Sequence, residues 1–141
     1  MRALVAIDGS GNALRAVRYL IDHHDLFRPD AELLLVNVHR PVPSSRVKAM
    51  VGQEAIDIYY REEAEAALAP ARAMLAGTAW RVTERRIVGQ PVTEIIAAAQ
   101  QAGCDLIVMG TQGRSALGDL LMGSVATRVI ATSPIPVLSI R

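Results

Sequence analysis

The stretch that decides the fold is GTQGRSALGDLLMGSVAT, residues Gly110–Thr127. It follows the apolar run Leu106–Met109, which is typical of a buried strand. It leads into Val125, Val129 and Ile130, which recur at helical spacing. Two glycines therefore lie where a strand ends, and a third glycine with a hydroxyl side chain lies where a helix begins. Glycine backbone and a helix N-terminus both present N–H groups to anions, so the stretch predicts a phosphate-binding loop.

The same residues also permit a purely structural interpretation. Gly110 and Gly113 can be turn residues, and Gly123 with Ser124 can cap a helix, since glycine and serine often take these roles. Ser124 can equally donate a hydrogen bond to a phosphate oxygen. The local residues leave both interpretations open, and the rest of the chain has to decide between them.

Composition predicts one domain, residues 1–141, with a full hydrophobic core. The hydrophobic fraction of 51% and the mean hydropathy of +0.26 favour a sheet buried on both faces. No apolar run reaches the roughly 18 residues of a membrane span, and MRALVAIDGS is too short for a secretion signal. A net charge of +1 without a basic block argues against nucleic-acid binding. The single cysteine, Cys104, is expected to be a buried thiol and favours a cytoplasmic location.

Strand and helix patterns alternate along the chain. The expected strands are Ala3–Ile7, Leu33–Val38, Trp80–Val88, Leu106–Met109 and Ile135–Ile140. A helical pattern follows each of the first four, which predicts an α/β fold with a mostly parallel sheet. The strand Trp80–Val88 alternates most and is expected near a sheet edge.

Two of the expected helices have buried sides that the pattern identifies. For the long helix Gln53–Leu75 the predicted buried stripe is Ile56, Tyr60, Ala64, Ala67, Ala71 and Met74. Pro70 is expected to kink or strain this helix. The next helix opens at Gly89-Gln-Pro91, and its predicted buried side is Ile95, Ile96 and Ala99.

Ligands of parallel α/β sheets bind at the carboxyl ends of the strands, where the strand order reverses. Asp8-Gly9-Ser10 follows the first strand, and Gly110 follows the fourth. If these strands are neighbours, both motifs meet at one site. Asp8 can cap the following helix, alone or with Ser10, or it can bind a ribose or a metal-bound phosphate. Arg114 and Ser115 can also meet a phosphate.

Several familiar sites are missing from the sequence. Lys48 is the sole lysine, and no P-loop pattern surrounds it. Gly9 and Gly11 begin a dinucleotide fingerprint, but Leu14 stands where its third glycine belongs. No G-x-S-x-G elbow exists, and no spacing suggests a metal site built from protein ligands alone. His39 follows the second strand and is expected to be a solvated loop residue rather than a ligand.

Five segments together resemble the universal stress protein family over essentially the whole chain. They are VAIDGS (5–10), GQP (89–91), DLIVMGTQG (105–113), LLMGSVATRVI (120–130) and PVLSIR (136–141). The most specific part, Gly110-x2-Gly113-x9-Gly123-Ser124, is similar to the pattern of the ATP-binding branch of that family. The resemblance implies a three-layer, open, parallel five-stranded sheet with strand order 3-2-1-4-5 and helices on both faces.

The resemblance also implies a set of nucleotide-binding residues. They are Ala6, Asp8, Val38, Met109, Gly110, Gly113, Arg114, Ser115, Gly123, Ser124 and Val125. By resemblance, Asp8 lies near the ribose, Val38 contacts adenine, and Ala6 makes a backbone contact to the adenosine end. The glycine segment surrounds the ribose and phosphates. One departure is Gln112, where many members carry His or Arg.

These features predict an ATP-binding protein that acts as a stress-response switch or sensor with an unidentified protein partner. Mg²⁺ or Mn²⁺ is expected to be held mainly by the phosphates, and AMP or cyclic AMP stays open as the nucleotide. One alternative is a slow ATPase or ATP-using transferase; another is a nucleotide-free dimeric scaffold or chaperone-like protein. The last strand is expected at a sheet edge, where Val137, Leu138, Ser139 and Ile140 would pair with a second copy in a homodimer.

Overall fold

The structure, a computed structural model, describes residues 1–42, 49–112 and 122–141. Its centre is a sheet of five parallel strands in the order β3-β2-β1-β4-β5. The strands are β1 (Arg2–Ala6), β2 (Glu32–His39), β3 (Arg81–Val88), β4 (Leu106–Gly110) and β5 (Val137–Ile140). The helices are α1 (Gly11–Asp22), α3 (Gln53–Leu75), α4 (Pro91–Gln101) and α5 (Ser124–Thr132), with a 3-10 turn at His24–Leu26. The predicted fold class and strand order are confirmed.

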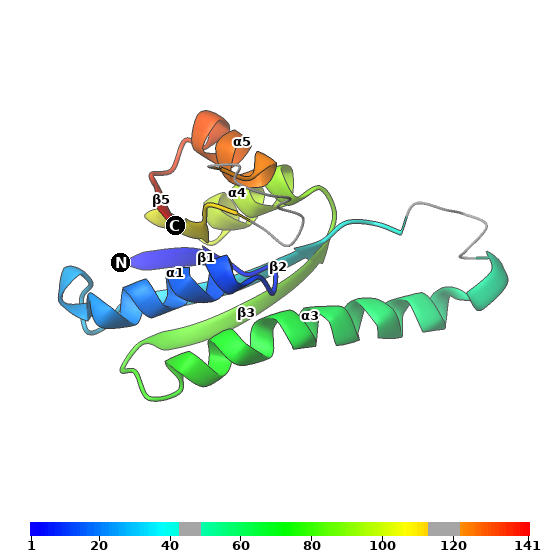
Figure 1. Cartoon of the computed structure of the whole chain (residues 1–141), viewed down its shortest axis with the longest axis horizontal. Helices are drawn as coiled ribbons and strands as arrows, with labels where there is room; N and C mark the ends of the chain where they lie inside the picture. Colours follow the sequence, from blue (N-terminus) through cyan, green and yellow to red (C-terminus); the bar gives the residue numbers. More distant parts are fainter. Residues whose placement is uncertain (43–48, 113–121) are drawn as a thin grey trace.

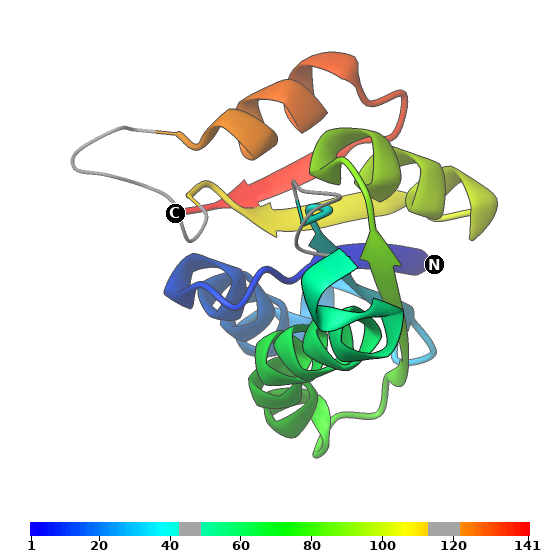
Figure 2. The same ribbon diagram turned by 90° about the vertical axis from the view of Figure 1, so that its right-hand side faces the viewer.

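Helices cover both faces of the sheet. α1 and α3 lie on one face, while α4 and α5 lie on the other (Figure 1). The three layers are also visible after a turn of 90° (Figure 2). β1 and β4 are direct neighbours, so the loops that follow them leave the same end of the sheet side by side. This is the strand reversal point at which such folds place ligands.

Successive side chains of each strand enter opposite cores. Val5 and Leu35 pack toward Leu68 of α3, whereas Leu4 and Ile107 pack toward α4 and α5. All five of these side chains are fully buried. Because both faces are covered, the three central strands β1, β2 and β4 are largely apolar, which contributes to the high mean hydropathy.

The long helix α3 has the predicted bounds, and Pro70 does not interrupt it. The predicted buried stripe is wrong at two positions. Tyr60 and Met74 are only half-buried, while Leu68 and Leu75 are fully buried in their place. Leu68 and Leu75 lie seven residues apart, on the helix face that packs against the core beneath α1 and the sheet. The first turns of α3 extend past the end of the sheet (Figure 1).

Two smaller expectations also need correction. In α4 the predicted core residue Ile96 is only half-buried, and Ala98, which was not predicted, is buried instead. The last strand begins at Val137 rather than Ile135, because Pro136 has no N–H to donate to its neighbour. The carbonyl of Pro136 still accepts a hydrogen bond from Ile107 N at 2.9 Å. β3 and β5 form the two sheet edges, as predicted.

Cys104 is buried in the core beneath α4, as expected for a lone packing thiol. Burial raises the pKa of this thiol, since the thiolate is poorly solvated there. Within the described ranges, no helix combines the length and the hydrophobicity that a membrane crossing requires.

Candidate functional site

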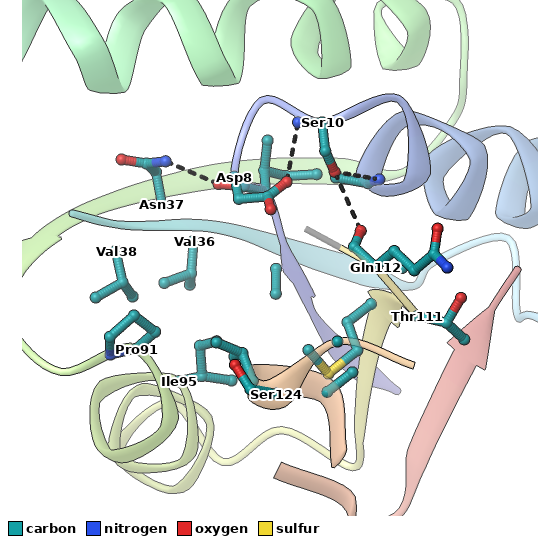
Figure 3. A pocket seen from close by; sticks show the side chains of 18 of the residues that line it. Asp8, Ser10, Val36, Asn37, Val38, Pro91, Ile95, Thr111, Gln112 and Ser124 are labelled. Carbon is teal, nitrogen blue, oxygen red and sulfur yellow. Dashed lines mark hydrogen bonds between the residues drawn. The ribbon is translucent and has the colours of Figure 1, made fainter. Parts of the chain in front are cut away.

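A cavity of about 500 Å³ opens at the carboxyl ends of β1, β2 and β4 (Figure 3). The first residues of α1, α4 and α5 complete its wall. Eight of the predicted site residues line it: Ala6, Asp8, Val38, Met109, Gly110, Gly123, Ser124 and Val125. The other three, Gly113, Arg114 and Ser115, lie outside the described residues. The fold thus brings the described candidates to one site, although they come from both ends of the chain.

One end of the cavity is apolar. Val36 and Val38 project from β2 toward Pro91 and Ile95 of α4 (Figure 3). They lie on the β2 face whose earlier residues enter the core beneath α4, so the alternation of the strand carries the apolar surface into the cavity. A flat apolar group is the natural occupant of this end.

The opposite end is polar and is organised by the turn between β1 and α1. Ser10 is the N-cap of α1, and its Oγ accepts a hydrogen bond from Ala13 N at 3.2 Å. The N–H of Ser10 in turn donates to Asp8 Oδ1 at 2.9 Å. Gly9, between them, has φ of 80°, a value that few other residues adopt. Asp8 therefore supports the cap and also lines the cavity, so the two sequence-based alternatives are compatible.

The start of α5 forms another part of this wall. Its N-cap is Gly123, not Ser124, so the interpretation of Ser124 as the cap is wrong. Ser124 is exposed at the first helical position. The N–H of Gly123 donates to Thr111 O at 2.6 Å and ties the helix start to the end of β4. Donors for an anion must then come from the first helical turn, whose N–H groups have no intrahelical acceptor.

Gly110 has a packing reason to be glycine. A Cβ at this position would lie 2.6 Å from the backbone carbon of Asn12 and 2.7 Å from its carbonyl oxygen. α1 and the end of β4 therefore approach each other more closely than any other residue would allow. Ser10 and Asn12 also reach Gln112, through hydrogen bonds of 3.5 Å to its carbonyl and 3.4 Å to its side chain.

Asn37 is a cavity residue that the sequence analysis did not select. It is 6% exposed, and its Nδ2 donates to Ile7 O at 2.8 Å, which holds the end of β1 against β2. The sequence does contain a signal for it, because Asn37 is the one amide in the otherwise apolar run of β2. A buried amide at a strand end generally has a fixed partner.

His39 was expected to be a solvated loop residue, and this is wrong. It lines the cavity, and its Nδ1 lies 2.7 Å from Arg40 O. Its ring packs edge-on against Tyr59 and Tyr60, with centroid distances of 5.4 and 5.1 Å. These tyrosines come from α3, so no local sequence pattern could place them beside His39.

The described ionisable side chains around the cavity give it no strong positive field. The described lining includes two carboxylates, those of Asp8 and Glu63, and one guanidinium group, that of Arg40. Within the described residues, the main donors for an anion are backbone N–H groups at the starts of α1 and α5. In the described part of the chain, no three His, Cys, Asp or Glu side chains are grouped to hold a metal ion. The cavity suits a ligand with a flat apolar part and an anionic part.

Comparison with known proteins agrees with this architecture. The model of the universal stress protein family matches residues 1–141. Universal stress protein MJ0531 of Methanocaldococcus jannaschii is 32% identical over 99% of this chain and 81% of its own. A protein of the same family from Thermus aquaticus is 34% identical over 98% and 96% of the two chains.

Solved structures agree as well. The structure of MJ0577 from Methanocaldococcus jannaschii has a TM-score of 0.83 and 27% identity, over 99% of this chain and 94% of its own. A universal stress protein in complex with cAMP has a TM-score of 0.60 and 28% identity, over 100% and 96%. One from Archaeoglobus fulgidus in complex with dAMP has a TM-score of 0.66 and 25% identity, over 100% and 98%. The chain belongs to the universal stress protein family.

Proposed function

We propose that this chain is an ATP-binding, cytoplasmic stress-response switch, in which residues 1–141 form one nucleotide-binding domain. The observation that carries the proposal is the cavity whose apolar and polar ends match the two ends of a nucleotide. Relatives of this fold in complex with cAMP and with dAMP support an adenine nucleotide as the ligand. The nucleotide state of the chain would change how readily it contacts a protein partner.

The residues fit the parts of ATP in order. Adenine would lie between Val38 and Pro91, where both of its faces meet apolar side chains. The ribose would lie beside Asp8, whose carboxylate can accept from a hydroxyl group. The phosphates would meet the first turn of α5 at Ser124 and Val125. Mg²⁺ or Mn²⁺ would be held mainly by the phosphates.

Calorimetric titration of the purified chain with ATP and Mg²⁺ tests the proposal. Mass spectrometry of the sample beforehand identifies any nucleotide already bound, which has to be removed. We expect saturation at one ATP per chain, with AMP and cyclic AMP titrated in parallel to rank the ligands. Absence of saturable heat with all three nucleotides, from a folded sample, would remove the nucleotide proposal.

Hydrolysis of bound ATP is expected to be slow. Catalysis of phosphoryl transfer comes mainly from fixed positive charge at the transferring phosphate. Arg40 is the one guanidinium among the described lining residues, and the chain has a single lysine. We expect turnover well below the roughly 1–100 s⁻¹ of kinases, measured as phosphate release. Turnover within that range would favour the ATPase or transferase alternative.

The proposed homodimer forms through β5, which is a sheet edge with four half-buried residues. The carbonyl of Pro136 accepts a hydrogen bond from Ile107 N of β4, and that of Ile140 accepts one from Thr111 N just after β4. These alternate residues therefore direct their backbone polar groups toward the sheet. Val137 and Ser139 then direct theirs outward, where an antiparallel copy could pair. We expect a dimer in sedimentation velocity at micromolar concentration.

Two proline variants of β5 sharpen this prediction. Ser139→Pro removes an outward N–H and is expected to shift the dimer toward monomer while keeping the fold. Leu138→Pro is the matched contrast, since it removes an inward N–H and is expected to destabilise the sheet itself. A monomeric parent protein, or an unchanged dimer of Ser139→Pro, would contradict pairing through β5.

A further inference from the structure

A second cavity, of about 280 Å³, lies between α3 and the carboxyl ends of β2 and β3. It shares Asn37 and His39 with the candidate nucleotide cavity but faces the other side of the sheet. The other described lining residues are Asp57, Tyr60, Arg61 and Ala64 of α3 and Arg86, Ile87 and Val88 of β3. No residue that the sequence analysis assigned to the nucleotide belongs to this set.

Among the described lining residues, the balance of charge in the second cavity is opposite to that in the first. The second is lined by two guanidinium groups, those of Arg61 and Arg86, and by one carboxylate, that of Asp57. In the first cavity, by contrast, the described carboxylates outnumber the guanidinium groups. Counted over the described residues, the second cavity therefore offers more guanidinium groups to an anion than the first does.

The partners of these charged groups single out Arg61. Arg86 already donates to Glu65 at 2.8 Å, and Asp57 accepts from Gln53 Nε2 at 2.8 Å. Arg61 makes no hydrogen bond or ion pair with any other described residue. A guanidinium with five donors and no described partner, at the rim of a cavity, is suited to a carboxylate or phosphate.

The rest of the wall would meet a flat apolar group. The ring centroids of Tyr60 and His39 lie 5.1 Å apart at an interplanar angle of 60°, and Ala64 of α3 adds aliphatic surface. The hydroxyl oxygen of Tyr60 accepts from Val42 N at 2.8 Å, which leaves the hydroxyl hydrogen for a ligand. The cavity thus has an aromatic and aliphatic side and a cationic rim.

We propose that this second cavity binds a small aromatic phosphate monoester, with the phosphate on Arg61 and the ring against Tyr60. The volume exceeds what an inorganic phosphate ion fills, so the organic part contributes contact area. The proposal does not depend on nucleotide binding in the first cavity. Because Asn37 and His39 border both sites, occupancy of one is also expected to alter affinity at the other, and this coupling is reciprocal.

Titration of the ¹⁵N-labelled chain with phenyl phosphate, followed by amide chemical shifts, tests the proposal. We expect saturable shifts in residues 57–64 and 86–88, both without nucleotide and with AMP at saturation. Inorganic phosphate is expected to bind the same residues more weakly. Shifts confined to Ser10 and residues 123–126, or lost when AMP is added, would place the probe in the first cavity and overturn the proposal.

Variants of two exposed arginines provide a second test of this proposal. Arg61→Gln is expected to weaken phenyl phosphate binding roughly tenfold, as for the loss of one charge-assisted hydrogen bond. Arg18→Gln removes the same charge from an exposed position of α1, outside both cavities, and is expected to bind like the parent. ATP calorimetry on both variants reports separately on the nucleotide site. Equal weakening in the two variants, or none in Arg61→Gln, would contradict the assignment.

Discussion

Gly123→Val is expected to weaken ATP binding by roughly a hundredfold, a loss of about 3 kcal/mol. Gly123 lines the cavity at the N-cap of α5, where the phosphates are proposed to lie. A branched side chain there would fill space that the phosphates need and hold them away from the helix N–H groups. Its φ of −73° and ψ of 153° are ordinary extended values, so valine is compatible with the backbone.

Calorimetry gives the affinity of Gly123→Val, and thermal unfolding shows whether the variant is folded. Ala131→Val is the control, because it places the same branched side chain at an exposed position of α5 outside the cavity. The control is expected to bind ATP like the parent. If a folded Gly123→Val binds ATP as tightly as the parent does, the start of α5 is not the phosphate site.

Gly110→Ala is expected to destabilise the fold by roughly 2–3 kcal/mol. The added methyl group would meet the backbone of Asn12 at 2.6 Å, and backbone cannot move aside as the end of a flexible side chain can. β4 and α1 would have to separate, which strains the centre of the sheet. Urea unfolding of the nucleotide-free protein measures the change.

Gly77→Ala is the control for this stability prediction. A Cβ at Gly77 meets no atom within 4 Å, and its φ is not positive. We expect this variant to match the parent or to gain up to about 1 kcal/mol from a stiffer unfolded chain. Equal stability of the two variants would mean that α1 adjusts to a side chain at position 110 without cost.

Gly110 and Gly123 differ in how far the sequence could predict their roles. Both belong to one spacing pattern, and the pattern predicts close approach of backbone to an anion. For Gly110 the structure adds a second reason, the close contact with the backbone of Asn12, a residue that is distant in the sequence. Contacts of this kind leave no periodic trace near either residue, so they were not predictable.

The helices and strands themselves were largely predictable, because apolar periodicity and chain breakers act locally. The bounds of α3 are an example. The prediction of its buried face was less accurate, since it named Met74 where Leu75 is buried. Which of two adjacent residues faces the core depends on the angle at which the helix meets the sheet. The strand order came from resemblance to a family rather than from any local pattern.

The sequence by itself determined the α/β class, the alternating elements and most of the residues at the ends of β1 and β4. Those features are local in the chain, and side-chain periodicity and turn chemistry encode them directly. Only the tertiary structure decided that Asn37 would hold Ile7, that His39 would meet two tyrosines, and that Arg61 would border a second cavity. These arrangements depend on how α3 and the sheet pack together, and packing joins residues whose separation in the chain carries no information about their distance in space.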